Sequence, residues 1–148
     1  MKLISLPNTD IRFSEIGLGT SHFGTHTDRD TSYRILDRWA EAGGNVIDTA
    51  HIYGAVRPED KSASEETIGS WLVSRGMRDR IVLCTKGAHP AIRPLTQRHG
   101  PSRLKPAEWL QDLERSLESL RTDTIDLYFL HRDDPSVPVP EIMDALEE

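Results

Sequence analysis

The chain has 148 residues, a length that suits one domain with a sizeable hydrophobic core. Apolar residues make up 36% of it and charged residues 28%, and its net charge is −6, with acidic and basic residues interleaved. This balance does not indicate a basic surface for binding nucleic acid, and no apolar run approaches the roughly 20 residues that are needed to span a bilayer. The first residues turn polar too early for a signal peptide, and Cys84 is the only cysteine, so we expect a cytoplasmic protein without an internal disulfide.

Short alternating and apolar stretches predict the strands and helices in chain order. Residues 2–6 and 11–16 alternate apolar and polar side chains around the turn sequence PNTD, which indicates a β-hairpin. Four later runs predict strands over residues 14–20, 45–50, 81–86 and 125–131. Segments of helical period predict a helix after each strand, over residues 31–42 and 63–75 and then from residues 106 and 138 onward.

Local signals mark the ends and faces of these helices. Ser62 followed by Glu65 has the spacing of a capping box before the second helix, and Gly76 is expected to end that helix. Pro106 suits the first turn of the third helix. The core-facing stripe of the first helix is predicted to consist of Leu36, Trp39 and Ala40. That of the third is predicted to consist of Leu110, Leu113, Leu117 and Leu120.

Strict alternation of strand and helix predicts parallel βαβ units with right-handed crossovers. The strands are continuous apolar runs, as expected where helices cover their outer faces. Two architectures fit this pattern, an open doubly wound sheet and a closed (β/α) barrel. A dinucleotide-binding Rossmann fold is a weak match, because Gly17 and Gly19 are followed by His22 where its fingerprint requires a third glycine.

Three of the four predicted strands end at a side chain that can carry charge: Asp48, Lys86 and His131. The carboxyl ends of parallel strands lie on one face, and in a barrel that face carries the active site. Tyr53 enters the same region from the loop after the second strand. We therefore expect these four side chains to converge.

Side-chain alternation along the third predicted strand separates two faces. Lys86, Cys84 and Val82 are expected on the interior face of a barrel, and Leu83 and Ile81 are expected against the helices. Cys84 is accordingly expected to be a packed small apolar residue rather than a reactive thiol.

The four converging side chains favour proton transfer at an oxygen atom. An ammonium within ~4–6 Å stabilises the phenolate form of a tyrosine, and Asp48 is the counter-ion that a partly buried Lys86 needs. His131 can orient a carbonyl oxygen by hydrogen bonding. Such a site suits reduction of a carbonyl or oxidation of an alcohol, and a cofactor must carry the hydride because no side chain does.

This constellation resembles the aldo-keto reductase family. The matching stretches, in the family's order, are the N-terminal hairpin, GLGT, GGNVIDTAHIYG, SEETIGSWL, CTK and IDLYFLH. The resemblance implies an α/β fold, a TIM (β/α)8 barrel whose floor is closed by the hairpin, with hydride from a nicotinamide cofactor, usually NADPH. It implies a catalytic tetrad of Asp48, Tyr53, Lys86 and His131, with Tyr53 as general acid. It also places Gly19, Thr20 and Asp48 near the nicotinamide ribose.

Such a barrel has eight βα units and about 250 residues or more. Residues 1–148 supply the hairpin and about the first four units, so we expect a single domain that is the N-terminal half of a barrel. We expect this chain alone neither to bind NADPH tightly nor to turn over a small carbonyl substrate, and to self-associate through exposed strand edges. Two further interpretations stay open: a cofactor-binding regulatory subunit on the same fold, and an inactive half barrel that associates with itself.

Other polar and aromatic residues carry weaker expectations. His22 and His26 lie four apart in a loop, and no metal site is expected there or elsewhere. His51 has two interpretations, a substrate-pocket wall or an exposed loop residue. The loop from residue 54 to 64 is longer than the family's common pattern. Core packing is expected for Trp39, Trp71 and Trp109, and a solvated surface loop for Arg93, Arg98, Arg103 and Lys105.

Overall fold

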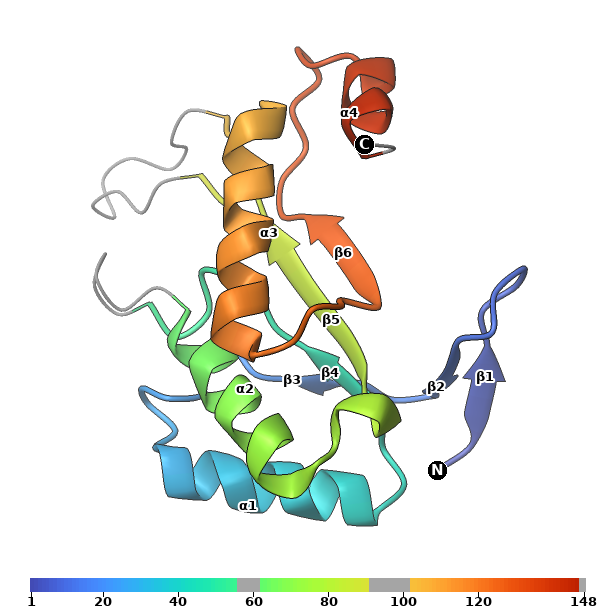
Figure 1. The fold of residues 1–148 in the computed structure, drawn as a ribbon, viewed down its shortest axis with the longest axis vertical. Helices are drawn as coiled ribbons and strands as arrows, with labels where there is room; N and C mark the ends of the chain where they lie inside the picture. Colours follow the sequence, from blue (N-terminus) through green and yellow to red (C-terminus); the bar gives the residue numbers. More distant parts are fainter. Residues whose placement is uncertain (56–61, 91–101, 147–148) are drawn as a thin grey trace.

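A computed structural model describes residues 1–55, 62–90 and 102–146, and Figure 1 traces the chain. Its elements are β1 (Leu3–Ser5), β2 (Arg12–Ser14), β3 (Leu18–Gly19), α1 (Arg29–Glu41), β4 (Val46–Asp48), α2 (Ala63–Arg75), the 3-10 helix η2 (Arg78–Arg80), β5 (Val82–Gly87), α3 (Pro106–Leu120), β6 (Leu127–Leu130) and α4 (Val139–Leu146). The strands and helices follow the order predicted from the sequence.

The predicted N-terminal hairpin is confirmed and is joined to the main sheet through an asparagine. β1 pairs antiparallel with β2, and Leu3 lies opposite Ser14. The side chain of Asn45 accepts a hydrogen bond from Ser14 N at 2.6 Å and donates one to Arg12 O at 2.8 Å. The predicted strand over residues 14–20 is split, because residue 14 pairs within the hairpin and only Leu18–Gly19 joins the main sheet.

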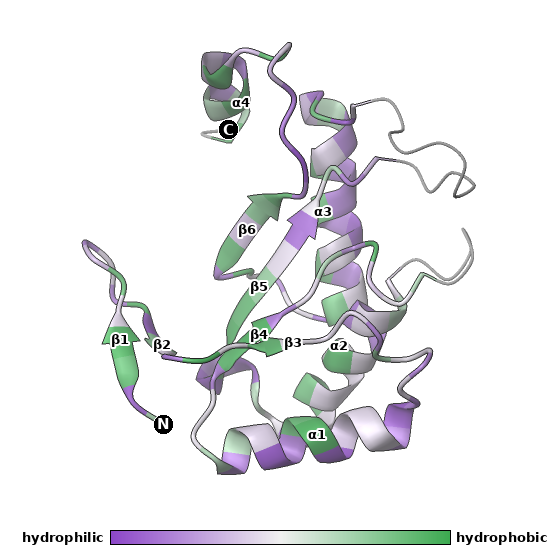
Figure 2. Cartoon of the chain, turned by 180° about the vertical axis from the view of Figure 1, so that it is seen from behind, coloured by the Kyte–Doolittle hydropathy of each residue, from purple (hydrophilic) through white to green (hydrophobic). Residues whose placement is uncertain are grey.

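The main sheet is parallel, with the strand order β3-β4-β5-β6. Its register places Gly19 beside Asp48, Asp48 beside Cys84, and Cys84 beside Leu127. The helices α1, α2 and α3 lie on one side of this sheet, as the opposite views in Figures 1 and 2 show. A doubly wound sheet carries helices on both faces, so the one-sided arrangement favours the barrel architecture.

The main hydrophobic core fills the space between the sheet and these helices. Ile47 of β4 and Leu83 of β5 are fully buried there and pack against apolar side chains of the three helices, namely Leu36, Ile68, Trp71, Leu72 and Leu120. Along β5, side chains alternate between this core and the opposite face, where Lys86 lies beside Phe129 of β6. The predicted alternation of the strand over residues 81–86 is therefore confirmed. Phe129 is 49% exposed, so part of the second face is open.

The helix α1 begins two residues before its predicted start because Asp28 caps it. The Asp28 carboxylate accepts a hydrogen bond from Thr31 N at 2.8 Å, and this bond lowers the pKa of Asp28 below its ordinary value. Within the predicted core-facing stripe, Leu36 is fully buried but Trp39 and Ala40 are only half-buried.

The helix α2 has its predicted bounds, but the predicted capping box is wrong. Ser62 adopts a left-handed backbone conformation, with φ 69°, and makes no cap hydrogen bond through its side chain. Its hydroxyl instead lies 2.9 Å from Nδ1 of His51. Glu65 does not reach back to the cap, because its Oε1 accepts a hydrogen bond from Thr85 of β5 at 2.6 Å. Gly76 ends the helix with φ 59°, as predicted.

The buried face of α3 differs from the predicted leucine stripe. Of the four predicted leucines, only Leu120 is buried, Leu110 is exposed, and the other two are half-buried. The buried positions are Trp109, Asp112, Ser116 and Leu120. Hydrophobic periodicity missed this face because two of its four side chains, Asp112 and Ser116, are polar.

Of the three tryptophans predicted to pack in the core, Trp71 and Trp109 are fully buried. Trp39 is half-buried and lies against Gly44, where an added Cβ would come within 2.2 Å of its ring. The absence of a side chain at Gly44 therefore allows the indole of α1 to pack against the backbone before β4.

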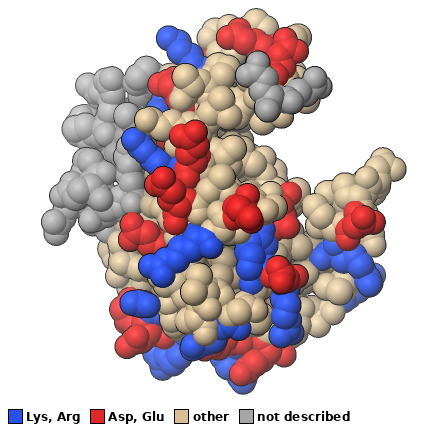
Figure 3. Space-filling view, in the orientation of Figure 1, with Lys and Arg blue, Asp and Glu red and all other residues tan. Residues whose placement is uncertain are grey.

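Charged groups of both signs are interspersed on the face shown in Figure 3, in line with their interleaving in the sequence. Two arginine–carboxylate pairs illustrate this mixture, Arg38 with Glu41 and Arg75 with Asp37, each at 3.0 Å. Within the described part of the chain, no helix combines the length and the hydrophobicity that crossing a membrane requires.

Candidate active site

The four side chains predicted to converge do lie together at the carboxyl end of the main sheet. Asp48 ends β4, His131 directly follows β6, and Tyr53 lies in the turn after β4. The Nζ atom of Lys86 donates to Asp48 Oδ1 at 2.7 Å and to Tyr53 Oη at 3.3 Å. The rings of Tyr53 and His131 meet edge to face, with centroids 6.0 Å apart. The structure thus brings all four together, while their roles in a reaction stay a prediction.

Lys86 has an acceptor for each of its three ammonium protons. Besides Asp48 and Tyr53, Nζ donates to the backbone oxygen of Thr49 at 2.8 Å. The Lys86 side chain is 18% exposed and that of Asp48 is 38% exposed, so water screens this ion pair only in part. The sequence does not reveal the part played by Thr49, because a backbone acceptor has no residue-type signature.

The turn that carries Tyr53 is held by its backbone and by a glycine. Tyr53 N donates to Ala50 O at 2.9 Å, and Ser64 N donates to Tyr53 O at 3.2 Å. Gly54 has φ 82°, and a Cβ there would lie 2.9 Å from Cβ of Ala63. Both the conformation and the close approach require glycine at this position. The phenol of Tyr53 therefore extends from a well-defined backbone toward Lys86.

Burial determines the charge state of His131. Burial first, and then the neighbouring His89 and Lys86, lower the pKa of His131 from 6.5 to about 4. At pH 7 the imidazole is therefore neutral, with a proton on one of its two ring nitrogens. Its Nδ1 is buried and has no hydrogen-bond partner among the described residues. A neutral imidazole here can offer one donor and one acceptor to a bound group.

A second histidine lies beside His131, and no sequence motif pointed to it. The ring of His89 meets that of His131 edge to face, with centroids 4.6 Å apart and an interplanar angle of 85°. Nδ1 of His89 lies 2.7 Å from Pro90 O, and because a carbonyl only accepts, Nδ1 carries a proton. The available signal was position: His89 comes three residues after Lys86, on the loop that leaves the same end of the sheet.

Residues 15–148 match the model of the aldo/keto reductase family. The chain belongs to this family. Among curated relatives of this aldo/keto reductase, norsolorinic acid reductase stcV of Emericella nidulans is 40% identical over 95% of the chain and 37% of its own length. Oxidoreductase YrpG of Bacillus subtilis is 36% identical over 99% of the chain and 45% of its own length. The aryl-alcohol dehydrogenase [NADP(+)] of Phanerodontia chrysosporium is 32% identical over 95% of the chain and 38% of its own length.

The solved structures agree with this assignment. The aldo-keto reductase AKR11C1 from Bacillus halodurans, in a holo form, superimposes with a TM-score of 0.80 and 31% identity, over 99% of this chain and 45% of that one. The chain thus spans about two fifths of the length of the curated relatives it matches. The predicted fold class is confirmed: a hairpin followed by about four βα units of an aldo/keto reductase TIM barrel.

Three residues of this aldo/keto reductase are predicted to approach the nicotinamide ribose: Gly19, Thr20 and Asp48. A Cβ on Gly19 would meet no heavy atom within 4 Å, so the space over this strand end is open. Thr20 is 1% exposed, and its hydroxyl donates to Asp48 O at 2.9 Å and accepts from Ser64 Oγ at 2.9 Å. Open space over Gly19 and the partly exposed Asp48 carboxylate fit a bound ribose, whereas Thr20 supports Asp48 from inside the fold. A cofactor contact by any of the three stays a prediction.

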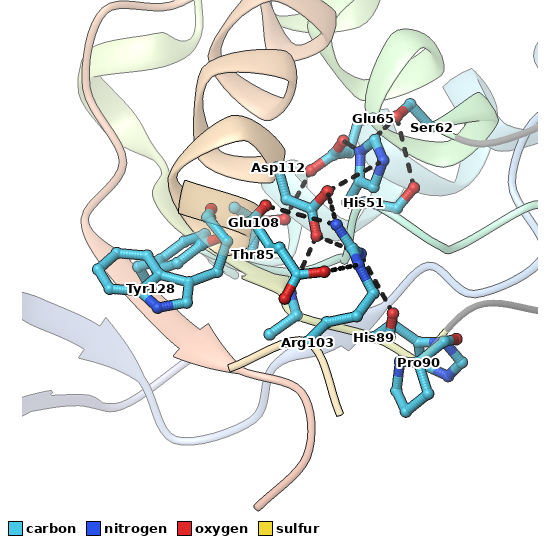
Figure 4. Close-up of polar contacts among 12 residues, drawn as sticks. His51, Ser62, Glu65, Thr85, His89, Pro90, Arg103, Glu108, Asp112 and Tyr128 are labelled. Carbon is cyan, nitrogen blue, oxygen red and sulfur yellow. Dashed lines mark hydrogen bonds and ion pairs between the residues drawn. The ribbon is translucent and has the colours of Figure 1, made fainter. Parts of the chain in front are cut away.

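The interpretation of His51 as an exposed loop residue is wrong, because it is 5% exposed and belongs to a buried polar cluster, whereas a place in the wall of a substrate pocket stays a prediction. Figure 4 shows the cluster. The ring lies between two buried carboxylates, with Nδ1 3.8 Å from Glu65 and Nε2 3.8 Å from Asp112. The backbone N of His51 donates to Lys86 O at 3.0 Å. His51 therefore supports the turn that leads to Tyr53.

Two smaller expectations concern Cys84 and the histidine pair. Cys84 is buried, and burial raises the pKa of its thiol to about 11, so it is a packed thiol, as predicted. The rings of His22 and His26 meet edge to face at 5.4 Å, and both line a pocket of about 200 Å³ beside Tyr53. Among the described residues, no three His, Cys, Asp or Glu side chains gather in a way that suits a metal ion.

The predicted solvated basic loop needs correction at Arg103. Its side chain is 19% exposed, and Nη1 lies 2.7 Å from Asp112 Oδ2 in a salt bridge. Lys105 is exposed, as predicted, and precedes α3. Arg93 and Arg98 lie outside the described residues, as do residues 56–61 of the loop that is longer than the family's common pattern.

Proposed function

We propose that this chain carries the proton-transfer site of an NADPH-dependent aldo-keto reductase, which reduces small aldehydes and ketones to alcohols with Tyr53 as general acid. The observation that carries the proposal is the position of one ammonium between two groups. Lys86 Nζ contacts both the carboxylate of Asp48, at 2.7 Å, and the phenol of Tyr53, at 3.3 Å. Family membership supports the reaction class, and the contacts support the assignment of roles.

In this proposal Tyr53 Oη gives its proton to the carbonyl oxygen of the substrate. The ammonium of Lys86 stabilises the phenolate that forms, because opposite charges at this distance in a partly buried site attract strongly. Asp48 balances the ammonium, so the site does not hold an uncompensated charge before the proton leaves. The backbone oxygen of Thr49 fixes the third proton of Lys86 and thereby the direction of the other two.

His131 orients the carbonyl oxygen in this scheme. Its pKa of about 4 keeps the imidazole neutral at pH 7, so it presents one N–H donor without adding a second positive charge beside Lys86. The Tyr53 ring lies edge-on to it, with centroids 6.0 Å apart. A carbonyl oxygen placed between the phenol and the imidazole would receive a hydrogen bond from each.

The proposed cofactor is NADPH, which when bound supplies the hydride that the carbonyl carbon receives. On the protein side, Gly19 leaves open space at its strand end, and the Asp48 side chain is 38% exposed. The name of one relative, aryl-alcohol dehydrogenase [NADP(+)], supports the phosphorylated cofactor over NADH. The same proposal includes a small carbonyl substrate, no nucleic-acid or membrane partner, and a cytoplasmic location.

We further propose that the 148-residue chain is incomplete for this activity. The two curated relatives stcV and YrpG are more than twice as long, since the chain covers 37% and 45% of their lengths. A barrel with about four of its eight units lacks half of the strand ends that surround a bound cofactor. Measurable NADPH-dependent reduction of an aldehyde by the purified chain would contradict this part of the proposal.

The test of the general acid is Tyr53→Phe in the full polypeptide to which residues 1–148 belong. Loss of the phenolic proton is expected to lower kcat for an aldehyde by ~10²–10⁴-fold. Tyr33→Phe is the matched control, because Tyr33 lies on α1 and its hydroxyl accepts a hydrogen bond from Arg29 at 3.1 Å, away from the strand ends. Equal activity of the two variants would reject Tyr53 as the acid.

A further inference from the structure

A buried carboxylate on α3 contacts the loops behind the candidate active site. Asp112 is 1% exposed and lies on the face of α3 that packs toward β5. It accepts two hydrogen bonds from Arg103, at 2.7 and 3.0 Å, and one from Ala88 N at 3.0 Å. Figure 4 shows Asp112 at the centre of this cluster. The four proposed reacting groups do not include it, so its function needs a separate explanation.

The Ala88 contact holds an unusual backbone conformation. Ala88 has φ 60°, in the left-handed region that residues other than glycine, asparagine and aspartate seldom adopt. A strained residue of this kind persists only when its surroundings hold it, and such residues collect at functional sites. Asp112 accepts a hydrogen bond from the amide of Ala88, and the methyl group of Ala88 packs with Leu104 and Trp109.

The conformation of Ala88 sets the direction of the next residue, His89. Arg103 adds a second restraint, because its Nη1 also donates to His89 O at 3.2 Å. Asp112 in turn fixes the guanidinium through the two-pronged hydrogen bond, which has a rigid geometry. The result is that the His89 ring stands edge-on to His131, with centroids 4.6 Å apart.

Asp112 also faces the loop that leads to Tyr53. Its Oδ1 lies 3.8 Å from Nε2 of His51, and Ser62 holds the other ring nitrogen at 2.9 Å. His51 precedes Tyr53 by two residues, and its backbone N donates to Lys86 O at 3.0 Å. One carboxylate therefore lies against both loops that border the site, with a hydrogen bond from Ala88 N and with Oδ1 3.8 Å from the His51 ring.

We propose that Asp112 is a positioning residue of this site: through Ala88 and Arg103 it fixes His89 against His131 and shields the His131 ring from solvent. The importance of this arrangement for catalysis rests on the proposed function. The arrangement itself does not, and it can be tested without any turnover.

The titration of His131 reports directly on the position of His89. Burial lowers the pKa of His131 most, followed by His89, Lys86 and Arg132, while Asp48 raises it. The phenol of Tyr53 faces the same ring. Movement of His89 away from His131 would admit water and remove a lowering influence. The pKa of His131 should then rise from about 4 toward its ordinary value of 6.5.

The chain offers a matched control at the other end of β5. Like Asp112, Asp126 is a carboxylate that accepts hydrogen bonds from a backbone amide and from an arginine. Leu83 N of β5 donates to it at 2.8 Å, and Arg78 donates at 2.9 Å. Asp126→Asn and Asp112→Asn therefore remove the same kind of charge from the same kind of contact, at a side chain that is 25% exposed for Asp126 and 1% exposed for Asp112. Only Asp112 is linked to His89, so only its replacement should change the titration of His131.

The experiment is an NMR pH titration of the His131 ring in the 148-residue chain and its variants. Asp112→Asn is expected to raise the midpoint by about one unit or more, and Asp126→Asn to leave it unchanged. Arg103→Lys retains the charge but breaks the two-pronged geometry and the bond to His89, so it should raise the midpoint too. If Asp112→Asn does not fold, the midpoint of His131 in Arg103→Lys tests the proposal by itself.

Unchanged His131 midpoints in every folded variant of Asp112 and Arg103 would overturn the proposal. An equal rise in Asp126→Asn would also overturn it, because the effect would then be general loosening. Failure of the proposed carbonyl reduction is a separate outcome, since the titration measures protonation and needs neither cofactor nor substrate.

Discussion

The phenol oxygen of Tyr53 lies 3.3 Å from Nζ of Lys86, and the same ammonium lies 4.7 Å from the centre of the Tyr53 ring. The cation therefore faces both the oxygen that would lose a proton and the ring over which the resulting charge spreads. Thirty-three positions separate the two residues in the chain, and the parallel pairing of β4 with β5 brings them together.

Replacement of Lys86 tests this relationship. Lys86→Met removes the ammonium and leaves Asp48 without its partner, so kcat for an aldehyde should fall by ~10²-fold or more in the full polypeptide. Lys86→Arg retains the positive charge and should lose less. Steady-state NADPH oxidation measures both. A Lys86→Met variant as active as the parent would show that the ammonium does not assist the phenol.

The hydrogen bond from Thr85 to Glu65 should contribute measurably to stability. Glu65 is fully buried, its Oε1 accepts from Thr85 at 2.6 Å, and its Oε2 has no hydrogen-bond partner among the described residues. Thr85→Val retains the shape but removes the donor, which should lower the free energy of unfolding by ~1–3 kcal/mol. Thr85→Ser, which retains the hydroxyl, is the control in urea denaturation. A valine variant as stable as the parent would contradict the expectation.

The contact of Asp37 with Trp71 and Arg75 should make stability depend on pH. Asp37 accepts hydrogen bonds from Arg75 at 3.0 Å and from Trp71 at 2.8 Å, and these lower its pKa below the ordinary 3.8. The folded-state value is below the unfolded one, so the stabilisation is present above about pH 4 and is lost as pH falls through the folded value. The carboxylate is 36% exposed, so we expect a contribution of ~1 kcal/mol or less.

Thermal unfolding of the parent and of Asp37→Asn at several pH values measures this contribution. The difference between them should be largest near neutral pH and shrink in acid. Glu41→Gln is the control, because the Arg38–Glu41 pair is 83% and 63% exposed and should contribute almost nothing. A difference between parent and Asp37→Asn that does not change with pH would rule out the titration of Asp37 as its source.

Self-association of the 148-residue chain should depend on the open face of the sheet. Phe129 is 49% exposed on that face, and β6 is an edge strand. Phe129→Glu is expected to shift the chain toward monomer in light scattering over a range of concentrations. Val73→Glu is the control, because Val73 is 61% exposed on the helix side and its replacement should change nothing. A monomeric parent chain would refute the prediction.

Local patterns in the sequence were sufficient to predict several features. The turn residues between β1 and β2, the glycine at position 76 and the alternation of apolar runs depend on near neighbours, and the structure confirms them. The convergence of Asp48, Lys86 and His131 also followed from sequence, because each lies at or directly beyond the carboxyl end of a parallel strand. The sequence alone shows which residue ends a predicted strand, and parallel topology places the carboxyl ends of the strands on one face.

Tertiary structure alone decided how the polar groups pair. Ser62 and Glu65 have the spacing of a helix cap, yet they contact His51 and Thr85 because burial brings those partners closer than the helix end. Asp112 is buried on α3 against the expectation from hydrophobic periodicity, and Arg103 and Ala88 N supply its hydrogen bonds. Burial of a polar side chain is costly unless it is hydrogen-bonded, and packing between distant segments decides which partner it meets.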